Sequence, residues 1–274
     1  MKLVKAELLK IRTTSTWWVF GIVMLPLWAA SLLVNWASAN FSTQGDQSGL
    51  DPDQAEQIRV AGEAVNVAAN LYTSGQFFGT LIVMLLAAII VTNEFFHLTA
   101  TTTFLVTPRR ESVVLAKLAA AALLGLVFWL VMTILNLIFA PLILSSLDVG
   151  SQLGEGAIWR AIALNGLAFI LWAVLGVGFG VLIRSQLAAT VTLALVYVVG
   201  SLGASIIFQI LTQNVAEWFS KLEVLVPTTA SALMISGTDL PGNPPRWVGA
   251  VVLLGYAIIA GVLGTVIMKR RDIA

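Results

Sequence analysis

Charged residues are scarce in this sequence, and cysteine is absent. Charged side chains make up 11% of the 274 residues and hydrophobic ones make up 58%, whereas about a quarter of the residues in a soluble domain are charged. A surface this apolar could not be kept in water, so we expect an integral membrane protein. Without cysteine, disulfides and thiolate metal sites are excluded.

Sequence motifs for catalysis are also absent. The single histidine, His97, has no H-E-x-x-H context, and no G-x-S-x-G or G-x-x-x-x-G-K-[ST] motif occurs in the chain. We therefore do not expect an enzyme, a metal site or a Walker-type ATP site in this chain. The long apolar stretches also lack the Asp, Glu or Lys that ion-coupled carriers usually place at mid-membrane.

The charges that are present divide the chain into six long uncharged windows. Each window is longer than the roughly 20 residues that a helix needs to cross a hydrocarbon core of about 30 Å. Because lipid offers backbone amides no hydrogen-bond partner, and the windows show no alternation typical of a β-barrel, they predict helices. The windows are 13–45, 64–93, 118–147, 161–183, 185–216 and 247–268. They predict one all-α domain over 1–274, with spans at about 17–38, 73–93, 118–144, 161–183, 187–211 and 247–268.

The basic residues predict the orientation of these spans. Four basic residues precede the first window and three follow the last one, so both termini are expected in the cytoplasm. Alternation of the loops then gives the cytoplasmic side eleven basic residues and leaves only Arg59, Arg160, Lys221 and Arg246 outside. A cleaved secretory signal ending near Ala37-Ser38-Ala39 is the alternative for the N-terminus. The apolar run 17–36 is longer than a signal core of roughly 7 to 15 residues and favours an uncleaved span.

Three segments outside the spans have a distinct character. Residues 2–13 place Val4, Leu8 and Ile11 at helical spacing opposite basic residues, which predicts an amphipathic helix on the inner leaflet or, alternatively, a disordered basic tail. The outer segment 212–246 is apolar but interrupted by charges and by Pro227. It predicts two short, re-entrant-like helices broken at that proline, which dip partway into the outer leaflet. Residues 40–72 predict a loop and then a helix from about Asp53 to Leu71.

The glycines within the spans allow two interpretations, and so do the polar amides. Gly176 and Gly180 form a small-xxx-small face, which suits either an interface between subunits or packing within one. The amides of Asn35, Asn136, Asn165 and Gln209 are candidates for the substrate path. Amides of this kind more often bridge helices by hydrogen bonds.

The connection between the second and third spans, residues 93–117, is too apolar for a solvated linker. Its aromatic and aliphatic residues need burial against the inner leaflet or a docked protein. Thr107 as N-cap with Pro108 at the first helical position predicts a helix that carries Arg109 and Arg110 into the third span.

This connection resembles the signature region of ABC-2 type permeases, the membrane subunits of ATP-binding-cassette exporters, particularly actinobacterial forms. The family pattern has Glu, then Gly-Thr, an apolar stretch, Pro-x-Arg and a later Lys. The matching residues here are Glu94, Thr99, Phe104 to Val106, Pro108, Arg110 and Lys117. The chain departs from the pattern at Leu98, where the family usually has Gly.

The resemblance implies a permease subunit of an ABC exporter in the cell membrane. A second permease chain, identical or different, would complete the substrate pathway, and two copies of a separate ATPase subunit would hold ATP and magnesium. We expect membrane lipid as a partner and no nucleic acid. The residues implied in coupling to the ATPase are Glu94, Phe95, Phe96, His97, Thr99, Pro108, Arg109 and Arg110. For the two arginines, anchoring at the cytoplasmic membrane surface is an equally open role.

Two other functions fit the same hydropathy. One is a carrier or facilitator that works alone, and the other is a membrane scaffold or sensor that moves no substrate. Fold-level analogy does not identify a substrate.

Overall fold

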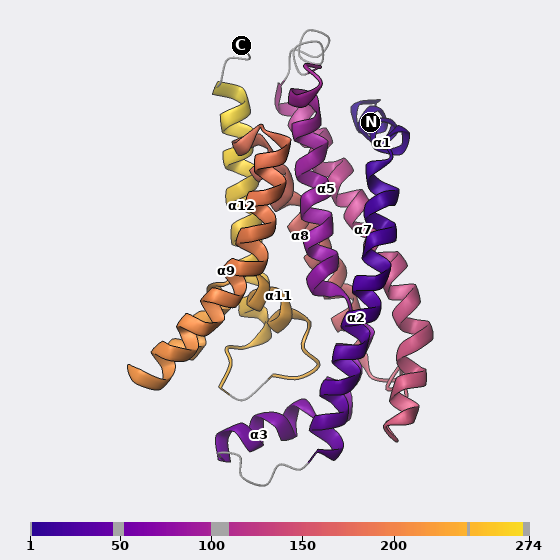
Figure 1. Ribbon diagram of the computed structural model, residues 1–274, viewed down its shortest axis with the longest axis vertical. Coiled ribbons are helices and arrows are strands. Elements are labelled where there is room, and N and C mark those ends of the chain that lie inside the picture. Colours follow the sequence, from indigo (N-terminus) through magenta and orange to yellow (C-terminus); the bar gives the residue numbers. More distant parts are fainter. Residues whose placement is uncertain (1, 46–51, 100–109, 240–241, 271–274) are drawn as a thin grey trace.

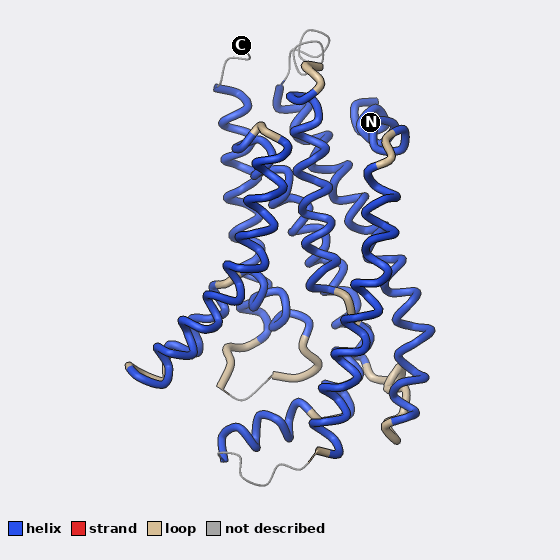
Figure 2. Tube along the Cα trace, in the orientation of Figure 1, coloured by secondary structure: helices blue, strands red, loops and turns tan. Residues whose placement is uncertain are grey.

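The structure is a computed structural model that describes residues 2–45, 52–99, 110–239 and 242–270. Within these ranges every regular element is a helix and no strand occurs (Figure 2). Six of the helices are long and apolar enough to cross a membrane. The predicted all-α fold with six membrane-crossing helices is therefore confirmed.

The helices extend beyond the predicted spans because a helix can continue into the polar region flanking a membrane. The long helices are α2 (Thr16–Gln44), α5 (Gln76–Phe96), α7 (Arg110–Ser146), α8 (Gly156–Ile183), α9 (Gln186–Asn214) and α12 (Arg246–Arg270). The short elements are α1 (Lys2–Thr13), α3 (Pro52–Ala61), α4 (Ala64–Tyr72), α10 (Phe219–Leu222), the 3-10 helix η1 (Glu223–Leu225) and α11 (Pro227–Ile235).

Both ends of the chain lie at the same end of the bundle. Figure 1 shows α1, the last turn of α12 and the end of α5 together at the top, and α3 at the bottom. We call these the α1 end and the α3 end. Six crossings between two termini place both termini on one side, as the charge distribution predicts, and the same distribution predicts that the α1 end faces the cytoplasm.

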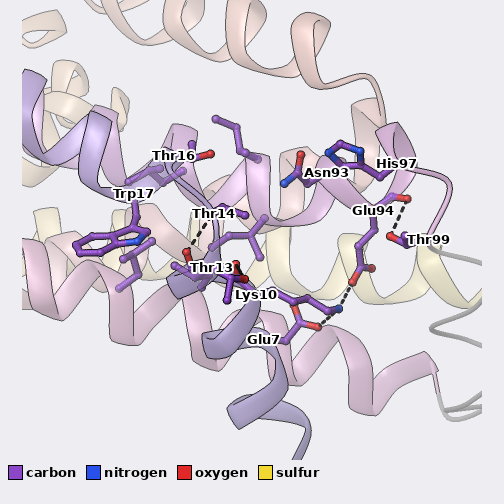
Figure 3. A pocket seen from close by; sticks show the side chains of 15 residues that line it. Glu7, Lys10, Thr13, Thr14, Thr16, Trp17, Asn93, Glu94, His97 and Thr99 are labelled. Carbon is purple, nitrogen blue, oxygen red and sulfur yellow. Dashed lines mark hydrogen bonds and ion pairs between the residues drawn. The ribbon is translucent and has the colours of Figure 1, made fainter.

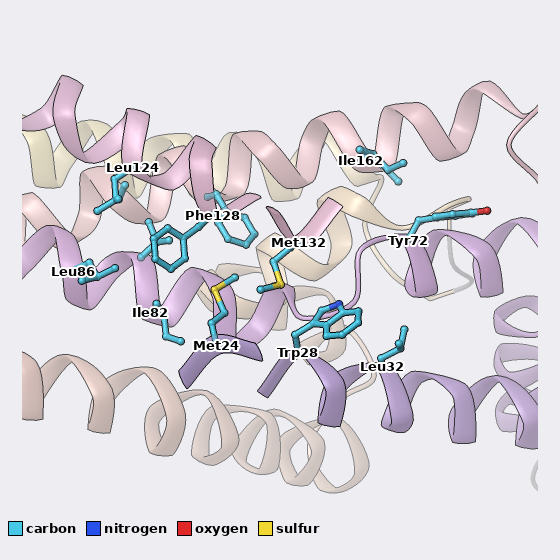
Figure 4. Packing of buried hydrophobic residues seen from close by; sticks show 14 of the residues in the cluster. Met24, Trp28, Leu32, Tyr72, Ile82, Leu86, Leu124, Phe128, Met132 and Ile162 are labelled. Atoms are coloured by element: carbon cyan, nitrogen blue, oxygen red, sulfur yellow. The ribbon is translucent and has the colours of Figure 1, made fainter. Parts of the chain in front are cut away.

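The main core is formed by the facing sides of α2, α4, α5, α7 and α8. Met24 and Trp28 of α2 point toward Ile82 of α5 and toward Phe128 and Met132 of α7, and all five side chains are buried (Figure 4). The opposite faces of α2 and α9 carry many exposed large hydrophobic side chains. A helix that is apolar all round suits a protein whose surroundings are lipid.

Glycines on α8 allow it to approach its neighbours closely. A Cβ atom at Gly176 would collide with the backbone carbonyl of Met84 on α5, and one at Gly180 would lie 2.8 Å from the carbonyl of Ala88. Gly178, between them, faces Ala260 of α12. The small-xxx-small face thus packs within this chain.

The segment between α9 and α12 is built from short helices, with its break at the expected proline. Pro227 occupies the first turn of α11, where its missing N–H costs nothing. The Trp172 indole N–H of α8 donates to the Ser231 hydroxyl at 2.8 Å, and Tyr256 of α12 donates to the Leu225 carbonyl at 3.0 Å. These bonds fix the segment against α8 and α12; its insertion into the outer leaflet stays a prediction.

The part of the chain that leads into α5 is also divided into short helices. The predicted helix from about Asp53 to Leu71 is divided into α3 and α4 at Gly62 and Glu63. Between α4 and α5, Gly75 has a φ of +84°, a left-handed conformation that glycine adopts without strain.

Candidate functional site

The α1 helix places a carboxylate at the centre of its buried face. Val4, Leu8 and Ile11 are half-buried at helical spacing, as predicted, and Glu7 lies among them with 5% of its surface exposed. The basic residues Lys2, Lys5 and Arg12 are exposed on the other side. This stretch is a helix rather than a disordered tail.

Glu7 belongs to a cluster of four charged residues from three helices. The Lys117 Nζ atom of α7 lies 2.9 Å from Glu7 Oε2 and 2.8 Å from Glu94 Oε1 of α5. Lys10 Nζ lies 2.8 Å from Glu7 Oε1 and 2.6 Å from Glu94 Oε1. We call Glu7, Lys10, Glu94 and Lys117 the ion-pair cluster. Its two carboxylates and two ammonium groups balance in charge.

Burial makes Glu7, Glu94 and Lys117 dependent on their partners, whereas the Lys10 side chain is 48% exposed. Only 1% of the Lys117 side chain and less than a tenth of each glutamate side chain are exposed. A buried charge costs several kcal/mol when it loses its partner. The cluster therefore holds α1, the end of α5 and the start of α7 together as one unit.

The pKa values of Glu7 and Lys10 in α1 reflect this arrangement. Burial by itself would raise the pKa of the Glu7 carboxyl, but the Lys117 and Lys10 ammonium groups outweigh it and hold that pKa below 4.5. Burial likewise opposes the charge of Lys10, but hydrogen bonds to the Glu7 and Glu94 carboxylates raise the Lys10 pKa above 10.5. Both α1 members are thus charged at neutral pH.

The α5 helix ends in a Schellman motif next to the ion-pair cluster. The Thr99 N–H donates to the Glu94 carbonyl at 2.9 Å and the Leu98 N–H donates to the Phe95 carbonyl at 3.3 Å. Leu98 has a φ of +55°, the left-handed conformation that glycine favours at this position. The turn typical of a glycine is thus formed with leucine in its place.

The residues predicted to couple to an ATPase have different environments. Glu94 is buried in the ion-pair cluster, and Phe95 is half-buried against the main core. Phe96, His97 and Thr99 are exposed at the α1 end. Pro108, Arg109 and the predicted N-cap Thr107 lie outside the described residues, and Arg110 is the first residue of α7. Their coupling role stays a prediction.

A cavity of about 450 Å³ adjoins the ion-pair cluster (Figure 3). Glu7, Lys10 and Glu94 lie together on one side of it, and Trp17 lies on the other. The remaining wall combines aliphatic side chains, among them Leu86, Ile89 and Ile90 of α5, with hydroxyl groups of threonines. The cavity therefore has a charged part and an apolar part, a combination that suits an amphiphilic molecule or a lipid.

Two of the four candidate substrate-path amides meet at the turn between α4 and α5. Asn136 is fully buried; its Oδ1 accepts from the Trp28 indole N–H at 2.7 Å. Its Nδ2 donates to the Tyr72 and Ser74 carbonyls at 3.0 Å each. Asn35 Nδ2 donates to the Ser74 hydroxyl at 2.8 Å. Both amides thus bind helix α2 or α7 to this turn.

The other two amides lie elsewhere. Asn165 on α8 is buried, and its Oδ1 accepts no hydrogen bond from the described residues. Gln209 on α9 is exposed. The four amides do not converge on one cavity.

Sequence reasoning missed Glu7 and Lys10 as site residues and used Lys117 only as part of a motif. A glutamate is rarely buried unless it is paired, and its main partner is 110 residues away along the chain. One signal was available: Glu7 is the only acid among the basic residues of 2–13, at the centre of the apolar stripe.

Comparison with known proteins agrees with this geometry. A search of curated proteins found no match. A family model described as ABC-2 family transporter protein matches residues 3–201, a range that contains the whole ion-pair cluster. Membrane proteins of that family generally partner with ATPase subunits. With six membrane-crossing helices and a family match over most of its length, this chain belongs to the ABC-2 family of transporter proteins, as a multi-pass permease of the plasma membrane.

Proposed function

We propose that this permease is the membrane subunit of an ABC exporter, driven by a separate ATPase that docks on the connection between α5 and α7. Two permease chains, identical or different, form the substrate pathway. Two ATPase copies bind ATP and magnesium, and the present chain carries out no catalysis. Each ATPase closure then pushes the connection and shifts the transmembrane helices.

The ion-pair cluster is the observation that carries this proposal. Glu94 lies at the end of α5 and Lys117 near the start of α7, so the cluster joins the two sides of the connection. Glu7 adds α1 to the same unit. Because separation of buried charges is costly, a displacement of the connection moves all three helices together.

Exposed apolar side chains beside the connection support a docking role. Phe96 is 68% exposed and Leu98 is 84% exposed, both at the α1 end where α5 stops. Apolar groups next to a connection at the membrane boundary favour contact with a second protein or with lipid. The predicted cytoplasmic orientation makes an ATPase accessible to them.

The test is co-purification with an ABC ATPase subunit from the same organism. We expect Phe96→Glu combined with Leu98→Glu to abolish co-purification and permease-stimulated ATP hydrolysis, because charge disfavours burial at the interface. Phe96→Leu, which keeps the position apolar, is the control and should retain both.

Two other outcomes would favour the alternative functions. Uptake of a fluorescent amphiphilic dye by proteoliposomes without ATPase or nucleotide would support a carrier that works alone. A stable complex that hydrolyses ATP but moves no dye or lipid probe would support a scaffold or sensor.

A further inference from the structure

A second cavity at the α1 end lies between the last turn of α5 and the turn from α8 to α9. Its volume is about 620 Å³, within the range of roughly 300–1,000 Å³ typical of ligand pockets. Phe95, His97 and Arg184 line it, whereas the carboxylate of Glu94 belongs to the ion-pair cluster. The cavity is thus separate from the ion-pair cluster, and it shares Phe95, Phe96 and His97 with the residues predicted to couple to an ATPase.

No carboxylate among the described residues neutralises the positive charge that Arg184 gives this cavity. Among the described residues, no carboxylate oxygen lies within ion-pair distance of Arg184, and none of the residues that line the cavity is acidic. The nearest acid along α5, Glu94, is paired with Lys10 and Lys117. The guanidinium carbon lies 5.3 Å from the centroid of the Phe95 ring, a cation–π contact that orients the group.

The backbone of Arg184 is strained. Its φ is +53° and its ψ is −32°, in the single-residue turn that ends α8. Such a conformation is unfavourable for a residue with a Cβ atom, and strain of this kind clusters at functional sites. Glycine would relieve the strain but would lose the guanidinium.

The rest of the wall combines polar groups with an apolar rim. Asn93, Ser185, Gln186 and Thr190 supply amides and hydroxyls. Phe96 and Leu187 form the rim, with 68% and 75% of their surfaces exposed. These side chains lie where α5 and α8 end and α9 begins, which is the level at which lipid tails meet headgroups.

We propose that this cavity binds the phosphate headgroup of an anionic phospholipid from the leaflet at the α1 end. Arg184 forms charge-assisted hydrogen bonds with the phosphate oxygens, for which a guanidinium has the matching geometry. The acyl chains lie along Phe96 and Leu187. The predicted orientation makes this the cytoplasmic leaflet, where anionic lipids are concentrated.

The apolar rim formed by Phe96 and Leu187 indicates that the cavity binds a lipid rather than an acidic side chain of a docked protein. A surface that receives only a carboxylate needs no long aliphatic and aromatic groups beside the cation. Phe96 and Leu187 instead match a molecule with a charged head and apolar tails. The proposal concerns lipid binding alone and does not depend on coupling to an ATPase.

The experiment compares phosphatidylglycerol with phosphatidylcholine by native mass spectrometry of the purified full-length protein. We expect Arg184→Gln to weaken phosphatidylglycerol binding roughly ten- to hundredfold, because charge-assisted hydrogen bonds to the phosphate are lost. Gln keeps the Cβ atom, so the turn is equally strained in both proteins. Arg12→Gln, the same change at an exposed arginine of α1, should bind as the wild type does.

Arg184→Lys separates loss of the site from loss of the fold. A lysine retains the charge without the fork of donors and should bind phosphatidylglycerol with intermediate affinity. Equal affinities of wild type and Arg184→Gln would overturn the proposal, and so would equal binding of the two lipids by the wild type. Loss of ATPase co-purification in Arg184→Gln with unchanged lipid binding would instead assign the cavity to a protein contact.

Discussion

The ammonium group of Lys117 on α7 lies 2.8 Å from the carboxylate of Glu94 on α5, and almost none of the lysine side chain is exposed. This pair joins the two helices on either side of the connection that resembles the ABC-2 signature region. Glu7 shares the same lysine at 2.9 Å.

Removal of Lys117 should be strongly destabilising. Lys117→Met leaves two buried carboxylates with one ammonium group, and the expected cost is about 3–5 kcal/mol. Thermal unfolding of the protein in detergent would measure it. The double variant Lys117→Met with Glu94→Gln restores a neutral cluster and should recover part of the loss. Equal stabilities of the single and double variants would contradict the interpretation of a coupled cluster.

Acidification should weaken the contact of α1 with the bundle. The Glu7 carboxyl has a pKa below its ordinary value of 4.5 in the folded protein. The stability that its charge contributes is therefore complete above pH 4.5 and is lost as the pH falls through the folded pKa. The difference in unfolding temperature between wild type and Glu7→Gln should shrink below pH 4.5. A difference that stays constant from pH 7 to pH 3 would refute this role of Glu7.

Leu98→Gly should stabilise the end of α5. Leu98 has a φ of +55° and an 84% exposed side chain, so glycine removes left-handed strain of roughly 1–2 kcal/mol and little packing is lost. Hydrogen exchange of the Thr99 amide, which closes the Schellman motif, should become slower. Phe96→Gly, within the helix, is the matched control and should destabilise by about 1 kcal/mol. Faster exchange in Leu98→Gly would argue against this turn geometry.

Asn136 should be needed for stability whatever its part in transport. Asn136→Leu leaves the Trp28 indole N–H and the Tyr72 and Ser74 carbonyls without their partner. Each unpaired buried group costs about 1–3 kcal/mol, so we expect a loss of at least about 2 kcal/mol in the free energy of unfolding. Gln209→Leu, at an exposed amide, should change stability by less than about 0.5 kcal/mol. Similar losses in both variants would contradict the assignment.

The architecture could be predicted from the positions of charged residues alone. Because the lipid-crossing helices must exclude charge, uncharged windows define them without any knowledge of tertiary contacts. The helix break at Pro227 could also be predicted from local sequence, because proline is favoured in the first turn of a helix but disrupts the interior of one. Helix ends were less well predicted: α2 runs to Gln44, beyond the predicted 38, because helices continue past the apolar region.

The candidate site could be predicted only in part. Glu94 and Lys117 appear in the family pattern, but Glu94 pairs with Lys10, 84 positions away, and Lys117 pairs with Glu7, 110 positions away. The partners of Asn136 are likewise a side chain of α2 and two backbone carbonyls. Sequence spacing within one helix can mark a buried face, as it does for Glu7, but it does not identify the partner, because that depends on which helix faces are packed together.

The glycines of α8 limit how a transport cycle can change this molecule's shape. With Gly176 and Gly180 seated against the backbone of α5 and Gly178 against that of α12, α8 cannot slide by one turn without driving Cβ-bearing neighbours into those carbonyls. These three helices behave as a rigid frame. We therefore expect a shape change during transport to involve α2 and α9, whose outward faces carry exposed large hydrophobic side chains.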